Sequence, residues 1–221
     1  GYVDGMLDGT VPKNKRMQYL SIVSQEMQRL KILISSMLNL TKFDNGTIEI
    51  HYQLFPIQDL AFRTILMFES RLEKRNITLE GLDSEPVQVW GDPDLIGQVI
   101  YNLFENATKF VNTGGTITFT FKDEPNNTSI AIRNTGAGIS KEELPKIFER
   151  FYKSDDSRSH DKTGLGIGLD ITKHIVRLHK AQISVSSEEG EYTEFLIRLP
   201  KKDAPAESPT ENPEKQPKDA R

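Results

Sequence analysis

Strand-like and helix-like segments follow one another irregularly along the chain, and this order constrains the fold most strongly. Alternating apolar residues predict strands, and apolar residues three and four apart predict helices. The predicted strands are 47–52, 77–79, 87–90, 116–121, 129–133, 183–187 and 194–199. The predicted helices are 57–74, 93–110, 141–151 and 168–179. Because a regular βαβ repeat is missing, the pattern predicts an α+β fold, an α/β sandwich rather than a doubly wound sheet.

The first 46 residues carry a different pattern, which predicts a helical hairpin. A short helix breaks at residues 9–12, and a longer amphipathic helix follows to about Phe43. Its apolar positions are Tyr19, Ile22, Val23, Met27, Leu30, Ile32, Leu33, Met37, Leu38 and Leu40. One such helix pair cannot bury this surface alone, which favours pairing with a second copy into a four-helix bundle. Packing of the stripe on the rest of the same chain is the alternative.

The composition limits the functional classes. A formal charge of −4 supplies no basic face for nucleic acid. The chain has no cysteine, which excludes disulfides and thiol chemistry. No apolar run is long enough to cross a bilayer and no signal peptide opens the chain. Because the first residue is Gly1, we expect the natural protein to continue upstream. Residues 201–221 have no large apolar residue and are predicted to be disordered.

One predicted helix carries both a core face and a row of polar residues. Asp92 and Pro93 suit its N-cap and first helical position. Asn102, Asn106 and Lys109 are four and three apart, so they share one face. An amide carbonyl is a hard oxygen ligand and a lysine supplies a point charge, so this row suits a hydrated magnesium ion and a phosphate chain. A solvated helix face is the plainer interpretation.

Two glycine-rich segments strengthen the phosphate interpretation. Residues 134–138, Asn-Thr-Gly-Ala-Gly, end a predicted strand, where glycine lets the backbone approach a flat ligand. Residues 163–169, Thr-Gly-Leu-Gly-Ile-Gly-Leu, directly precede a predicted helix, where N–H groups and the helix N-terminus favour phosphate oxygens. An ordinary turn is the alternative for either segment. Neither segment has the Walker lysine pattern.

A polar segment lies between the two glycine-rich ones. Residues 148–153, Phe-Glu-Arg-Phe-Tyr-Lys, are followed by a polar run, 154–162, without apolar anchors. A long polar loop between an aromatic hinge and glycines is typical of a mobile nucleotide lid. A disordered surface loop is compatible with the same residues.

Taken in order, these segments resemble the motifs of bacterial sensor histidine kinases of two-component systems. Residues 102–110 are similar to the N box, 134–138 to the first glycine box, 148–153 to the F box and 164–169 to the second glycine box. The resemblance implies a Bergerat-type ATP-binding sandwich, shared with gyrase-type ATPases, after part of a dimerisation and phosphotransfer helical hairpin. It implies domains at 1–46 and 47–200 and a disordered tail at 201–221.

The resemblance also implies ATP and Mg²⁺ as ligands and gives each matched residue a role. Asn106 would ligate the metal, with Asn102 supporting it and Lys109 touching phosphate. Lys153 and Arg150 would reach the γ-phosphate. The nucleotide-binding residues implied, besides Asn106, are Phe110, Asn134, Gly136, Gly138, Tyr152, Gly164, Leu165, Gly166, Gly168 and Leu169. Among these, Phe110 and Tyr152 would line the adenine or ribose.

Three features bear on how far the family pattern applies. The family usually has Asp where this chain has Asn134, which keeps an acceptor for the adenine amino group but loses the charge. Related ATPases carry a water-activating Glu where this chain, like the kinases, has Asn102, so direct ATP hydrolysis should be slow. None of the four histidines, His51, His160, His174 and His179, stands in the family's phosphoacceptor motif. We therefore expect the acceptor upstream of Gly1.

The implied function is transfer of the γ-phosphoryl group of ATP to a histidine, which passes it to an aspartate of a response regulator receiver domain. The implied assembly is a homodimer through the N-terminal helices, in the cytoplasmic portion of a protein anchored in the cell membrane. Two alternatives stay open. Asn134 supports a degenerate nucleotide-binding dimeric scaffold without turnover, and a gyrase-type ATPase is disfavoured by Asn102.

Overall fold

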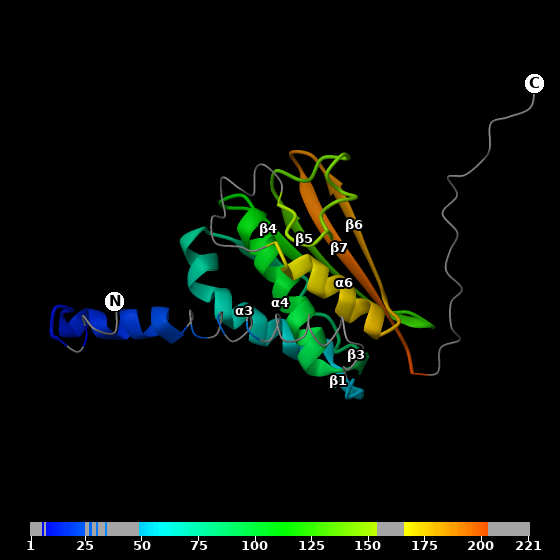
Figure 1. Cartoon of the computed structure of the whole chain (residues 1–221), viewed down its shortest axis with the longest axis horizontal. Coiled ribbons are helices and arrows are strands. Elements are labelled where there is room, and N and C mark those ends of the chain that lie inside the picture. The colour runs from blue at the N-terminus through cyan, green and yellow to red at the C-terminus, as the bar shows by residue number, and fades with distance from the viewer. Residues whose placement is uncertain are drawn as a thin grey trace, which may run out of the picture.

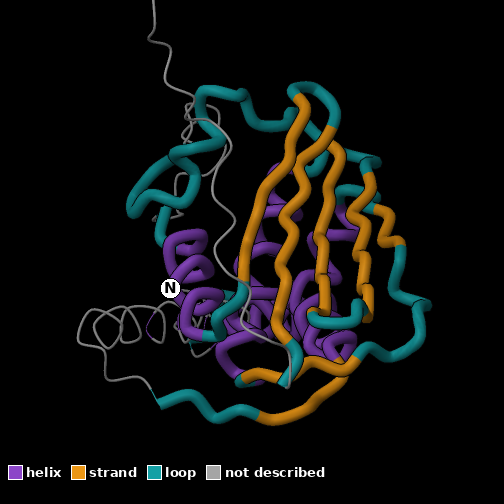
Figure 2. Tube along the Cα trace, turned by 90° about the vertical axis from the view of Figure 1, so that its right-hand side faces the viewer, coloured by secondary structure: helices purple, strands orange, loops and turns teal. Residues whose placement is uncertain are grey.

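The computed structural model describes residues 8–24, 49–153 and 166–202, together with residues 6, 27, 30 and 34. At its centre is a five-stranded sheet (Figure 1), and in Figure 2 the sheet faces the viewer with the helices behind it. The strands are β1 (Gln53–Pro56), β2 (Thr78–Glu80), β3 (Gln88–Gly91), β4 (Thr116–Asp123), β5 (Asn127–Thr135), β6 (Gln182–Glu188) and β7 (Tyr192–Pro200). The helices are the 3-10 helix η1 (Lys13–Lys15), α3 (Ile57–Lys74), α4 (Pro93–Phe110) and α6 (Gly168–Leu178).

The strand order confirms the predicted sandwich. The five-stranded sheet runs β2-β4-β5-β7-β6, and β1 pairs with β3 in a separate two-stranded ladder. Within the larger sheet, β2 and β4 are parallel and every other neighbouring pair is antiparallel. A doubly wound sheet would be mostly parallel, with helices on both faces.

The start of α4 follows from its sequence. The Asp92 carboxylate accepts hydrogen bonds from the backbone N–H groups of Asp94 (3.0 Å) and Leu95 (3.1 Å), and Pro93 occupies the first helical position. These contacts satisfy N–H groups that have no partner inside the helix. The helix ends at Phe110, so its whole length matches the predicted one.

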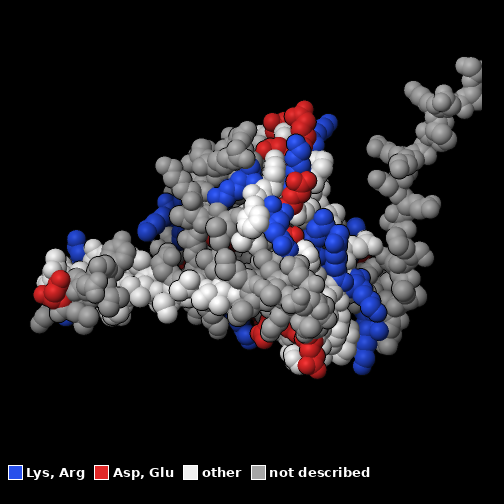
Figure 3. Space-filling view, in the orientation of Figure 1, with Lys and Arg blue, Asp and Glu red and all other residues white. Residues whose placement is uncertain are grey.

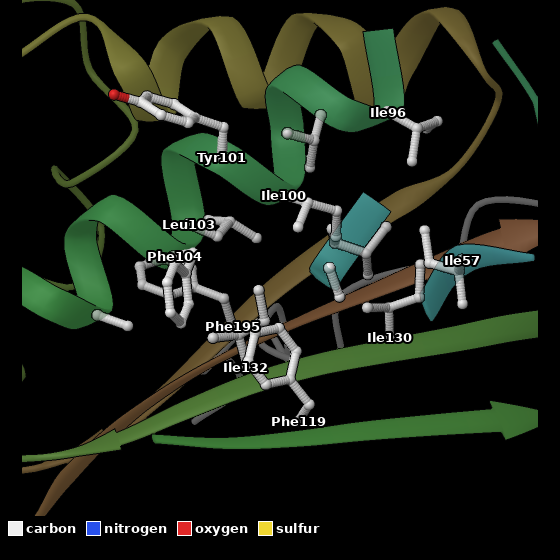
Figure 4. Packing of buried hydrophobic residues seen from close by; sticks show 14 of the residues in the cluster. Ile57, Ile96, Ile100, Tyr101, Leu103, Phe104, Phe119, Ile130, Ile132 and Phe195 are labelled. Carbon is white, nitrogen blue, oxygen red and sulfur yellow. The ribbon is translucent and has the colours of Figure 1, made fainter. Parts of the chain in front are cut away.

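The apolar face of α4 packs against the sheet (Figure 4). Phe104 is fully buried, with its ring centroid 5.5 Å from that of Phe119 on β4 and 5.4 Å from that of Phe68 on α3. Truncating a buried Phe to Ala typically costs about 3–5 kcal/mol of stability. This core fixes the position of α4, and therefore of the polar row on the same helix.

The predicted helix over residues 141–151 is wrong. The segment forms successive turns, with hydrogen bonds from the N–H of Glu143 to Ser140, of Lys146 to Glu143 and of Glu149 to Lys146. Pro145 lies in the middle of the segment. It has no N–H to donate, and its ring crowds the carbonyl four residues earlier. The apolar spacing of this segment favours a helix, but Pro145 prevents one.

The first predicted strand is also misplaced. Of residues 47–52, 49–52 are not strand, residues 47 and 48 lie outside the described ranges, and β1 starts only at Gln53. The register pairs Gln53 with Gly91, the last residue of β3, so the ladder has no partner for earlier residues. Instead the His51 N–H donates to the Asp92 carboxylate (2.9 Å). A side-chain acceptor thus takes over where the ladder stops.

The N-terminal region is described only in part. Residues 16–24 are helical, after a break in which Gly9 has φ +85°. Five of its apolar side chains expose between 49% and 76% of their surface: Met17, Leu20, Met27, Leu30 and Ile34. Pairing with a second copy stays a prediction, because much of the predicted apolar stripe lies outside the described residues. The predicted turn at residues 45–46 and the tail from residue 203 also lie outside them. No described helix is long and apolar enough to cross a membrane.

Candidate nucleotide-binding site

Two members of the predicted polar row lie half-buried near the end of α4. Within the described part of the chain, no hydrogen bond occupies the Asn106 amide. The Lys109 ammonium group lies 3.2 Å from the carboxylate of Glu105, one helical turn earlier. Asn106 is therefore available to a ligand, whereas Lys109 would exchange a contact with Glu105 for one with phosphate.

The third member, Asn102, joins α4 to α6. Only 6% of its surface is exposed, and its Nδ2 donates to the Gly168 carbonyl (3.0 Å) and the Thr172 hydroxyl (3.4 Å). A Cβ atom added to Gly168 would lie 3.5 Å from the Asn102 amide carbon, which is ordinary contact. The structure thus brings the predicted N box and the second glycine segment together through a side-chain amide.

The first glycine segment meets the C-terminal end of α4. Val111 and Gly136 form an antiparallel bridge. A Cβ atom at Gly136 would lie 2.2 Å from the Phe110 carbonyl oxygen, and its φ of +153° also favours glycine. Phe110 itself exposes 40% of its surface. Glycine at this position therefore lets the end of β5 touch the end of α4 directly.

Asn134 lies on β5, two residues before Gly136, with 3% of its surface exposed. Its Nδ2 donates to the Thr135 carbonyl (3.1 Å). A carboxylate could not make this contact, because it has no donor. The backbone of the next residue thus holds the Asn134 side chain at the place where the family usually has Asp.

Gly138 fixes the first glycine segment against the β6–β7 hairpin. Its φ is +72°, and an added Cβ atom would lie 2.2 Å from the Glu188 carbonyl oxygen. The Gly190 N–H donates to the Ala137 carbonyl (2.7 Å), and the Gly136 N–H donates to Glu191 (3.0 Å). The segment is therefore anchored on both sides.

The second glycine segment is described from Gly166 onward. Gly166 has φ +68°, and its carbonyl accepts the N–H of Phe151 (3.0 Å). This contact closes the base of the loop predicted to be a lid. Leu169 is partly buried against the core. The predicted binding residues Gly164 and Leu165, and the polar run 154–162, lie outside the described residues.

The aromatic and basic segment before that loop is held by carboxylates. Arg150 Nε donates to Asp170 Oδ2 on α6 (2.9 Å), and Asp170 is buried. The Tyr152 hydroxyl donates to Glu143 (3.2 Å). Lys153 is half-buried. Arg150 is therefore joined to α6 through Asp170.

Positive charge gathers over α6. Lys173 and Arg177 lie on this helix and Lys180 follows it, and Figure 3 shows Lys and Arg side chains running over this part of the molecule. The N-terminus of α6, at Gly168, adds the positive end of the helix dipole. Anions are favoured here although the whole chain carries a formal charge of −4.

The described side chains suit a metal only together with a phosphate ligand. No group of three or more His, Cys, Asp or Glu in the described ranges could hold a metal ion. Mg²⁺ keeps several waters and is usually bound by one or two protein oxygens plus substrate phosphates. The free carbonyl of Asn106 fits that arrangement. A magnesium ion held in this way would arrive with its nucleotide rather than before it.

Three structurally important residues were missed by the sequence analysis. Asp170 holds Arg150, Thr172 shares the Asn102 amide, and Arg75 contacts the end of α4. Thr172 lies four residues after Gly168, at helical spacing, which is the one signal that could have pointed to it, and Asp170 lies in the first turn of the same helix. Arg75 lies in no motif.

Comparison with known proteins agrees with this geometry. The model of the family described as histidine kinase-, DNA gyrase B-, and HSP90-like ATPase matches residues 91–203. The sensor protein SrrB of Staphylococcus aureus is 32% identical over 203 residues, which are 91% of this chain and 35% of SrrB. This chain thus spans about a third of the length of the curated relatives it matches.

Solved structures show the same fold. The catalytic domain of histidine kinase ThkA is 27% identical, with a TM-score of 0.59, covering 68% of this chain and 95% of that domain. ThkA in complex with the response regulator TrrA is 24% identical, with a TM-score of 0.60, covering 86% of this chain and 52% of ThkA. With the matched region spanning α4 and both glycine segments, this chain belongs to the family of histidine kinase-, DNA gyrase B- and HSP90-like ATPases.

Proposed function

We propose that this chain is the ATP-binding catalytic region of a sensor protein-histidine kinase. One observation carries the proposal: α4 contacts both glycine segments, through Asn102 to Gly168 at one point and through Phe110 to Gly136 at its end. The polar row on α4, suited to a metal and phosphate, therefore lies on the same helix that contacts the two glycine segments, suited to phosphate and a flat base. The match to SrrB across 91% of the chain, including residues outside the ATPase family match, supports a kinase within the broader family.

The roles we propose follow the resemblance to the family, and the half-buried positions of Asn106 and Lys109 support theirs. Asn106 binds Mg²⁺ through its amide oxygen, and Lys109 contacts a phosphate oxygen. Bound Mg²⁺ would neutralise charge on the β- and γ-phosphate oxygens. Gly136 and Gly138 shape the adenine site beside Asn134. Gly164, Gly166 and Gly168 border the triphosphate, with Leu165 and Leu169 beside them.

The reaction we propose is phosphoryl transfer to nitrogen. An imidazole nitrogen of the acceptor histidine attacks the γ-phosphorus in line, a P–N bond forms, and the bond from the γ-phosphorus to the bridging oxygen breaks. ADP leaves, and the attacking imidazole gives up its proton. A second transfer moves the phosphoryl group from the histidine nitrogen to an aspartate oxygen of a receiver domain.

Hydrolysis by the chain alone should be slow, because the position that would need a base holds an amide. Asn102 cannot accept a proton at neutral pH. Its Nδ2 is also occupied by the Gly168 carbonyl and the Thr172 hydroxyl. Activated phosphate is therefore reserved for the histidine acceptor.

The proposed partners and boundaries follow the family. We infer a homodimer through residues 1–46, for which the exposed Met17, Leu20 and Met27 side chains give support, a catalytic domain at 47–200 and a tail at 201–221. A response regulator is the second partner, by analogy with the ThkA complex. The acceptor histidine and a membrane anchor would lie in segments preceding Gly1.

A labelling experiment tests the proposal. The chain is mixed with Mg²⁺, γ-labelled ATP and a separate polypeptide that carries the histidine-bearing helices of a related kinase whose own ATP domain is inactive. We expect acid-labile label on the acceptor histidine. Nucleotide binding without transfer would favour a scaffold without turnover, and steady phosphate release without an acceptor would favour a gyrase-type ATPase. Either outcome would contradict the kinase proposal.

A further inference from the structure

The side chain of Arg75 binds the C-terminal end of α4, although Arg75 belongs to none of the sequence motifs. Its Nη1 donates to the backbone carbonyls of Thr108 (2.6 Å) and Lys109 (3.4 Å), and its Nη2 donates to the carbonyl of Val111. Arg75 follows the last residue of α3, so these contacts join residues 33 to 36 positions apart in the chain.

The backbone of Arg75 holds the connection that follows α4. Its carbonyl accepts the N–H of Gly114 (2.8 Å), and the next loop residue, Gly115, accepts the N–H of Thr78 at the start of β2. The side chain of Arg75 therefore holds the end of α4, and its main chain holds the turn that follows.

This end of α4 needs such a partner. The last carbonyls of a helix have no donor inside it, and they form the negative end of the helix dipole. A guanidinium group satisfies several carbonyls at once and places a fixed positive charge beside them. At Arg75 three carbonyls meet one planar cation.

The same helix end carries the groups assigned to the ligand. Asn106 and Lys109 lie within its last turn and a half, and Phe110 closes it. The Phe110 carbonyl also touches Gly136 so closely that a Cβ atom there would lie 2.2 Å away. Both Arg75 and the first glycine segment thus contact the end of α4.

We propose that Arg75 is a positioning residue for nucleotide binding, a role that rests on the proposed function. It holds the final turn of α4 so that Asn106 and Lys109 meet the metal and the phosphate in register. Its charge also offsets the negative helix end, which would otherwise repel a triphosphate. Loss of Arg75 therefore weakens binding of the magnesium nucleotide in a salt-dependent way.

The test measures binding of Mg²⁺ and a non-hydrolysable ATP analogue by calorimetry at low and high salt. The variants of the full chain are Arg75→Met, which removes charge and donors, and Arg75→Lys, which keeps the charge without the planar fork. Arg63→Met is the matched control, an exposed arginine on α3, the helix that Arg75 follows. We expect a loss of about tenfold for Arg75→Met at low salt, shrinking at high salt, and about threefold for Arg75→Lys.

The outcomes separate this inference from the proposed function. If the wild type and Arg63→Met bind the analogue while Arg75→Met binds within twofold of them, the positioning role is wrong and the kinase proposal stands. A salt-independent loss accompanied by a lower melting temperature would reduce Arg75 to a structural role. If Arg75→Met does not fold, Arg75→Lys decides by the same twofold limit. Failure of the wild type to bind would instead contradict the proposed function.

Discussion

The imidazole of His179 accepts a hydrogen bond from the backbone N–H of Asp92 at its Nε2 atom, over 3.1 Å. Its Nδ1 lies 2.8 Å from the carbonyl of Ile175 and donates to it, which fixes the neutral tautomer. Because Asp92 caps α4 and His179 follows α6, one buried ring joins the start of one site helix to the end of the other.

This contact predicts that the chain becomes less stable as the pH falls below about 6.5. Burial lowers the pKa of His179 below its ordinary value, although the contact with Ile175 and the charge of Asp92 act in the opposite direction. Below pH 6.5 the unfolded chain binds a proton at this ring that the folded chain does not. The free energy of unfolding should therefore drop, by at most about 1.4 kcal/mol per pH unit from this group.

Urea unfolding between pH 5 and pH 7.5 would measure this effect, with His179→Asn as the comparison because its side chain is neutral throughout. The variant should be less stable at pH 7.5 and should lose less stability on acidification. His174→Asn is the control, because His174 is a half-buried histidine on α6, the helix that His179 follows. Equal pH dependence in the wild type and His179→Asn would contradict the assignment.

Asn106→Ala should abolish the magnesium dependence of nucleotide binding. No hydrogen bond within the described residues holds the Asn106 amide, so the fold should lose little stability when the amide is removed. The amide oxygen is the protein ligand we assign to the ion. Calorimetry with ATP, with and without Mg²⁺, should give the same weak affinity for the variant. An unaltered response to Mg²⁺ would place the metal ligand elsewhere.

Asn134→Asp should bind ATP as tightly as the wild type or more tightly, while the free protein becomes less stable. The carboxylate gives the adenine amino group a charged acceptor. It cannot donate to the Thr135 carbonyl, however, and residue 134 exposes only 3% of its surface. Without nucleotide, the unsatisfied Thr135 carbonyl should therefore lower the free energy of unfolding by about 1–3 kcal/mol. Thermal unfolding with and without ATP separates the two effects, and weaker binding would argue against an adenine contact at this position.

The sequence predicted well whatever depends on local signals. The bounds of α3 and α4 agree with the apolar spacing, and the Asp92–Pro93 start was visible because capping is a short-range pattern. The turns around Pro145 show that one proline can override the helical spacing of the apolar residues around it. Arg75 could not be predicted, because its contacts depend on how α3 and α4 pack and not on the sequence around it.

For the candidate site too, the sequence predicted the local motifs but not the contacts between them. The glycine segments and the Asn106 row were found as patterns, and the structure adds which parts touch: Asn102 with Gly168, and Phe110 with Gly136. The Arg150 prediction depended on the resemblance alone. In the structure Arg150 pairs with the buried Asp170 on α6, twenty residues later in the chain. No local sequence pattern connects these two residues.

Gly136→Ala should weaken nucleotide binding much more than Gly114→Ala. Both glycines have positive φ, so both variants carry backbone strain of about 1 kcal/mol or more. An added Cβ atom at Gly136 would lie 2.2 Å from the Phe110 carbonyl, whereas at Gly114 it would meet nothing within 4 Å. Only Gly136→Ala must therefore push the end of α4 away from β5. We expect at least a tenfold loss of affinity for the magnesium nucleotide at Gly136→Ala and less than a threefold loss at Gly114→Ala, measured by calorimetry on folded protein. Equal losses would mean that strain alone matters and that contact between α4 and the first glycine segment does not shape the site.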